Sequence, residues 1–67
     1  MSVGEKIKLY LVQNNIHQYW LSEQAKIALP KLNASLNSKR KLSADEFEDI
    51  VIALKVDANL FLSKKYP

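Results

Sequence analysis

Apolar residues recur at helical spacing along most of the chain, in segments separated by short polar links. In the first segment they fall at positions i, i+4, i+7 and i+8, which places them on one side of a helix: Val3, Ile7, Tyr10 and Leu11. Ser2 and Glu5 have the spacing of a capping box, in which each side chain bonds a backbone N–H at the helix start. The pattern predicts a helix over residues 2–14 that serves mainly to form the core.

The middle of the chain predicts two short helices joined by a tight turn. Each has a pair of apolar residues one turn apart: Leu21 with Ala25, and Leu32 with Leu36. We expect helices over residues 17–25 and 28–37, with Pro30 in the first turn of the second, where its missing N–H costs no helical hydrogen bond. Two such helices form the helix-turn-helix pattern, which presents its second helix to a partner. Any small helical bundle also has short amphipathic helices with short links, so spacing alone leaves both interpretations open.

Two further helices are predicted in the last third of the chain. Ser43 and Glu46 repeat the capping-box spacing at the start of a helix over residues 43–55. Its apolar side comprises Phe47, Ile50, Val51 and Leu54. Asp57 is a suitable cap for a last helix over residues 57–62, in which Leu60 and Phe61 either close the core or face a second subunit. The predicted fold class is therefore an all-α, compact five-helix bundle formed by residues 1–67 as a single domain.

Composition narrows the class of protein. The chain has 67 residues, of which 48% are hydrophobic and 25% charged, as in a soluble globular domain. No apolar run is long enough to span a membrane, and the N-terminus lacks the apolar core of a signal peptide, so we expect a cytoplasmic protein. Cysteine is absent and His17 is the only histidine, which argues against a metal site or a cofactor. No nucleophile–base pair can be assembled, and the chain is not expected to be an enzyme.

Charge is distributed unevenly along the chain, although the net charge is only +3. Five basic residues follow one another with no acid between them: Lys26, Lys31, Lys39, Arg40 and Lys41. Four acids come directly after, at the start of the helix over residues 43–55: Asp45, Glu46, Glu48 and Asp49. A charge run is usually no more than a solvated surface, but this basic run overlaps the second helix of the pair and the loop that follows it. That placement favours a surface that faces phosphates.

Trp20 admits two interpretations. We expect part of its ring to pack against the first helix or the chain end, because lone aromatic residues usually serve burial. The alternative is an exposed aromatic residue that contacts a partner.

Several residues carry a resemblance to a known family: Gln18, Leu21, Ser22, Ala25, Ile27, Leu32, Asn37 and Lys39, together with the segment 53–57. With them, the chain from about residue 4 to residue 62 resembles the Cro/C1-type helix-turn-helix regulators of phages and bacteria, also called the XRE family. The resemblance implies a five-helix DNA-binding domain of the lambda-repressor-like type, whose third helix enters the major groove.

The resemblance also implies roles for individual residues. Gln18 would contact a phosphate at the start of the second helix. The residues facing base edges would be Ala28, Leu29, Pro30, Lys31 and Ala34. The residues holding the DNA backbone beside the groove would be Asn37, Lys39, Arg40 and Lys41.

The base-facing positions depart from the family pattern. Family members often carry Gln, Ser, Thr, Arg or Asn there, whereas Ala, Leu and Pro cannot form the bidentate hydrogen bonds that discriminate bases, each worth about 1–3 kcal/mol. Lys31 and Asn33 remain as polar side chains for readout, with Asn33 expected toward the edge of this surface. Lys26 stands where the family usually has glycine, and a left-handed backbone there would cost lysine roughly 1 kcal/mol relative to glycine.

Two functions remain open from the sequence. The first is a small, Cro-like transcriptional regulator that binds double-stranded operator DNA as a homodimer. The two subunits would contact each other through Leu60, Phe61 and the C-terminal tail, and the bound dimer would act as a repressor by blocking polymerase or a competing repressor. The second is an antirepressor or modulator of phage type that docks on a repressor protein. It would use Leu29, Pro30, Ala34 and Trp20 as an apolar patch.

Overall fold

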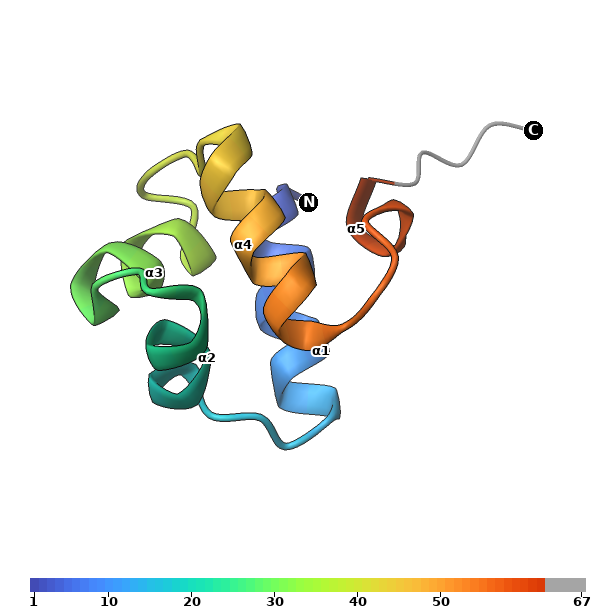
Figure 1. The fold of residues 1–67 in the computed structure, drawn as a ribbon. Coiled ribbons are helices and arrows are strands. Elements are labelled where there is room, and N and C mark those ends of the chain that lie inside the picture. The colour runs from blue at the N-terminus through green and yellow to red at the C-terminus, as the bar shows by residue number, and fades with distance from the viewer. Residues whose placement is uncertain (63–67) are drawn as a thin grey trace.

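Five helices and no strand make up residues 1–62, the part of the chain that the structure, a computed structural model, describes (Figure 1). They are α1 (Val3–Gln13), α2 (Gln18–Ala25), α3 (Leu29–Leu36), α4 (Ala44–Leu54) and α5 (Asn59–Leu62). The predicted all-α five-helix fold is confirmed, and every predicted boundary lies within two residues of the observed one. Within residues 1–62, none of these helices has the length and apolar character needed to cross a membrane.

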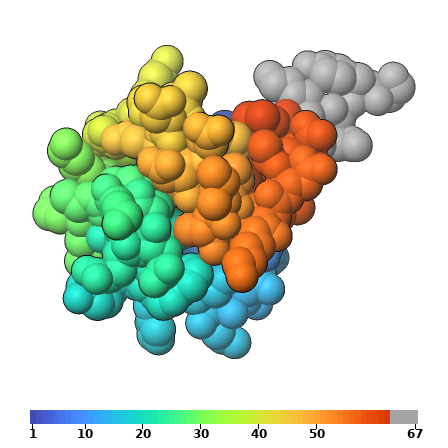
Figure 2. All heavy atoms as spheres, in the orientation of Figure 1, coloured from blue at the N-terminus to red at the C-terminus, as the bar shows by residue number. Residues whose placement is uncertain are grey.

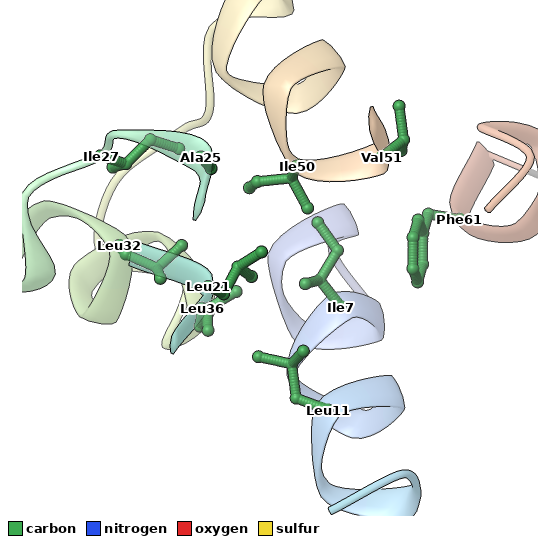
Figure 3. Close-up of a cluster of buried hydrophobic side chains, with 10 residues drawn as sticks. All are labelled: Ile7, Leu11, Leu21, Ala25, Ile27, Leu32, Leu36, Ile50, Val51 and Phe61. Atoms are coloured by element: carbon green, nitrogen blue, oxygen red, sulfur yellow. The ribbon is translucent and has the colours of Figure 1, made fainter. Parts of the chain in front are cut away.

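The core is built from all five helices and the turn before α3 (Figure 3). Its buried apolar members are Ile7, Leu11, Leu21, Ala25, Ile27, Leu32, Leu36, Ile50, Val51 and Phe61. Eight of them belong to the apolar stripes that the sequence predicts, while Ile27 lies in the turn and Phe61 was left open between two roles. Four other stripe residues are only partly buried: Val3, Tyr10, Phe47 and Leu54. Burial of these side chains is what brings the short helices together, because helices of this length are marginal in isolation.

Gly4 sets how closely α1 approaches α3. A Cβ atom at residue 4 would collide with the backbone carbonyl oxygen of Ser35 and would lie 2.9 Å from its carbonyl carbon. Gly4 and Ser35 are both buried. Glycine is therefore needed here for the close contact between two helices, although the sequence pattern shows it only as an unfavourable helix residue.

The turn between α2 and α3 is held by the backbone and by one buried side chain. Lys26 ends α2 with a left-handed backbone, at φ 58° and ψ 42°, so the conformation in which lysine is disfavoured relative to glycine is present. The hydroxyl of Ser22 donates a 2.6 Å hydrogen bond to the carbonyl oxygen of Ile27, and Ile27 itself is buried in the core. These contacts fix the direction in which α3 leaves the turn.

The short α5 closes the other side of the bundle through Phe61, which is 2% exposed. Its ring meets the edges of two partly buried rings, with centroids 5.6 Å from Tyr10 and 6.3 Å from Phe47. Of the two roles that the sequence left open for this residue, the core role is the observed one. Leu60 is exposed, and residues 63–67, the tail of the expected dimer contact, lie outside the described residues.

Candidate nucleic-acid interface

Helix α3 lies at the edge of the molecule, with one side against the core and the other free (Figures 1 and 2). Its inward side carries Leu32, Ser35 and Leu36, all of them buried. The five residues expected to face bases all lie on the accessible part of α3 and its cap: Ala28, Leu29, Pro30 and Lys31 are exposed, and Ala34 is half-buried. Leu29 keeps 39% of its surface exposed, so it is an apolar side chain available to a partner.

A chain of hydrogen bonds crosses the outward side of α3 and links it to α1 and α2. The Lys8 ammonium donates to Oδ1 of Asn37 at 2.7 Å. Asn37 in turn donates through Nδ2 to the backbone oxygen and to Oδ1 of Asn33, at 3.0 and 3.3 Å. Asn33 donates through Nδ2 to Oε1 of Gln18, at 3.2 Å. Gln18 and Asn37, two expected DNA contacts, are therefore connected through Asn33.

Two of the three residues in the basic loop are exposed. Lys39 and Lys41 make no side-chain hydrogen bond or ion pair within residues 1–62, and Lys31 on α3 is likewise exposed and unpaired in that range. Their ammonium groups remain available to an anionic partner. Lys31 lies on α3 itself, and Lys39 and Lys41 lie in the loop that follows α3.

Arg40 has a different environment from its two lysine neighbours. Its guanidinium makes a two-pronged ion pair with Glu46, at 2.7 and 3.1 Å, and also donates to the hydroxyl of Ser35 at 2.9 Å. The Arg40 guanidinium, together with the backbone N–H of Ser43, lowers the pKa of Glu46 from about 4.5 to about 2. Arg40 therefore joins the loop to α4 and α3, and its charge is largely matched within the protein.

A groove of about 690 Å³ runs beside the basic loop, between the starts of α1 and α4. Apolar side chains that line it include Val3, Leu42 and Phe47, and the polar residues around it include Lys39 and Lys41. Within residues 1–62, His, Cys, Asp and Glu form no group of three that could hold a metal ion. The chemistry of this region is therefore that of a basic rim over an apolar groove.

Sequence reasoning did not single out Lys8, and it expected Asn33 only toward the edge of the base-facing surface. Lys8 belongs to α1, far along the chain from α3, and only the packing of α1 on α3 brings its ammonium to Asn37. The spacing from Gly4 to Lys8, one helical turn, is the one signal that could have pointed to it. Trp20 is 43% exposed and is not among the side chains packed on the core, so the expected packing is at most partial.

In comparisons with known proteins, no family model, no curated protein and no solved structure matches the chain.

Proposed function

We propose that the chain is a small DNA-binding regulator that places α3 in the major groove of double-stranded DNA. The observation that carries this proposal is the combination of a free, outward side of α3 with three exposed lysines around it, Lys31, Lys39 and Lys41. A helix about the width of the major groove, flanked by ammonium groups that can meet phosphates, is the arrangement such binding requires. The resemblance to Cro/C1-type regulators supports the same function.

The proposal distinguishes the roles of the basic loop residues. Lys39 and Lys41 contact phosphates beside the groove, because their side chains are exposed and make no ion pair within residues 1–62. Arg40 holds the loop in place through Glu46 and Ser35. Its loss should therefore act through stability and loop position, whereas loss of the two lysines should act on affinity directly.

The test is a binding titration by fluorescence anisotropy at several salt concentrations, using duplexes enriched from a random library and an unrelated duplex as competitor. The double variant Lys39→Ala/Lys41→Ala should bind all duplexes more weakly. It should also flatten the plot of log affinity against log salt by about 2, since each phosphate contact contributes about 0.9 to that slope. Lys55→Ala is the control for a charge lost elsewhere, because it removes one charge, against two in the double variant, at the far end of α4. An unchanged slope in the double variant would show that the loop does not face DNA.

A second function is supported by a specific observation, the exposed apolar side chains Leu29 on α3 and Tyr19 and Trp20 on α2. Such a surface suits docking on another protein, as in an antirepressor that pairs with a repressor. Weak binding that is equal on enriched and unrelated duplexes would favour this function. Salt dependence alone would not separate the two, because a basic loop also suits an acidic protein partner.

A further inference from the structure

The order of donors and acceptors along the hydrogen-bond chain on α3 is fixed by Lys8. An ammonium group can only donate hydrogen bonds, so the atom of Asn37 that faces Lys8 at 2.7 Å must be the carbonyl oxygen Oδ1. The amide nitrogen of Asn37 must then point the other way, toward the backbone oxygen and Oδ1 of Asn33. The amide of the half-buried Asn37 therefore cannot reverse without losing these hydrogen bonds.

The orientation of the Asn37 amide also determines that of the Asn33 amide, although the Asn33 side chain is exposed. Its Oδ1 faces the donor Nδ2 of Asn37, and its own Nδ2 faces the acceptor Oε1 of Gln18. Reversing the Asn33 amide would oppose two donors at the Asn37 end, where Lys8 fixes the amide of Asn37, whereas the Gln18 amide could reverse with it. The orientation of the Asn33 amide is therefore set from the Asn37 side before any partner binds, and the bond to Gln18 adds a second contact that restrains the side chain. This restraint lowers the entropy lost on binding.

The groups left free on Asn33 define what it can recognise. With one N–H given to Gln18 and one lone pair given to Asn37, the amide retains one donor and one acceptor. Adenine shows the complementary pair in the major groove, the N7 acceptor and the N6 donor, whereas guanine shows two acceptors there. Pro30 and Ala34, its neighbours on the outward side of α3, offer no hydrogen-bonding side chain.

We propose that Asn33 is the specificity-determining residue of this surface and reads adenine in the major groove, with Gln18, Asn37 and Lys8 as positioning residues. The proposal rests on the DNA-binding function proposed above. It assigns sequence readout to a residue outside the five base-facing positions that the family resemblance implies.

The test is the base preference at each position of the site. Duplexes are enriched from a random library with the unaltered protein, and affinities are then measured for the enriched site and its single-base substitutions. The unaltered protein should prefer adenine at one position of the half-site by about 10- to 100-fold. Asn33→Ala should reduce this preference to less than about 3-fold at that position and leave the other positions unchanged.

Lys8→Met tests the positioning role, because methionine keeps the length of the side chain and removes the donor. It should reduce the adenine preference several-fold at the same single position. The loss of its charge would weaken all duplexes alike, so a change confined to one position reports on the amide and not on charge. Asn33→Ser provides a second variant if Asn33→Ala fails to melt cooperatively by circular dichroism, since serine is too short to make both bonds to adenine.

The outcomes separate this inference from the proposed function. If adenine preference persists in Asn33→Ala and Asn33→Ser, or if both variants weaken every duplex equally, Asn33 is not the reader and DNA binding still stands. If the unaltered protein prefers its enriched site over the unrelated duplex but shows no preference for adenine at any position, the inference also fails alone. If it binds duplexes neither selectively nor through Lys39 and Lys41, both fail together.

Discussion

At the scale of single residues, Gly4 shows how one missing side chain decides the distance between two helices. Replacing a glycine by alanine inside a helix normally stabilises a protein by up to about 1 kcal/mol, because alanine has the higher helix propensity. At residue 4 the added methyl group would meet the backbone of Ser35, which cannot rotate away.

Gly4→Ala should therefore lower the free energy of unfolding, by about 1–3 kcal/mol, as expected for overpacking. Urea denaturation followed by circular dichroism measures it. Val12→Ala is the control, since this exposed residue of the same helix should change stability by no more than about 0.5 kcal/mol. Equal or greater stability of the alanine variant at residue 4 would mean that α1 and α3 can separate at a cost no larger than the helix propensity gained.

Lys26 is a residue whose backbone conformation suits glycine better. Lys26→Gly should raise the free energy of unfolding by about 0.5–1 kcal/mol, because the residue is exposed and left-handed with φ 58°. Lys31→Gly, within α3, should instead lower it by about 1 kcal/mol. Thermal melting of the two variants compares them directly, and a drop in both would show that the Lys26 side chain contributes contacts that outweigh its backbone strain.

At the scale of elements, the ion pair between Arg40 and Glu46 joins the α3–α4 loop to the first turn of α4. Glu46 also accepts from the backbone N–H of Ser43, so one carboxylate caps the helix and anchors the loop. Its pKa is lowered to about 2, and a group with a lowered folded pKa stabilises the protein above its unfolded pKa. That stabilisation is lost as the pH falls from about 5 toward about 2.

Glu46→Gln should lower the free energy of unfolding at pH 7 by about 1–3 kcal/mol, toward the lower end because the side chains of Arg40 and Glu46 are 31% and 20% exposed. The difference from the unaltered protein should shrink as the pH falls through that range. Urea titrations at a series of pH values measure it. Glu48→Gln, on the same helix but exposed, is the control and should show only a small difference. A gap that stays constant with pH would exclude the ion pair as its source.

At the scale of the whole molecule, the attachment of α5 depends mainly on one buried side chain, that of Phe61. A domain of 67 residues has a total stability of only about 3–10 kcal/mol. Helix α5 has four residues, and its one buried member is Phe61, which contacts rings on α1 and α4.

Phe61→Ala should cost about 3–5 kcal/mol, a large part of the total, and should weaken or abolish cooperative thermal unfolding. Leu60→Ala is the matched control, since Leu60 is 52% exposed and should remain close to the unaltered protein. Melting curves recorded by circular dichroism compare the stability of the two variants with that of the unaltered protein. A cooperative melt of Phe61→Ala near the original temperature would mean that α5 is not part of the core.

The number of helices, their approximate ends and most of the core positions followed from the sequence by itself. Apolar spacing and capping residues are local properties, so they predict Val3–Gln13 and Ala44–Leu54 to within one residue at each end. The sequence indicated that lysine at residue 26 would be disfavoured relative to glycine if the backbone there were left-handed, and the backbone is left-handed. The exposure of the expected base-facing side of α3 also followed, because the opposite side carries the apolar stripe.

Only the tertiary structure decided which polar side chains meet. Arg40 and Lys39 are neighbours in a basic run, yet one is paired with Glu46 and the other is exposed. Asn33 is bonded to Gln18 on α2 and to Asn37 at the end of α3, and Lys8 on α1 fixes the orientation of the Asn37 amide. Such contacts depend on the distance and angle between helices, which one short contact at Gly4 helps to fix, and no local pattern in the sequence encodes them.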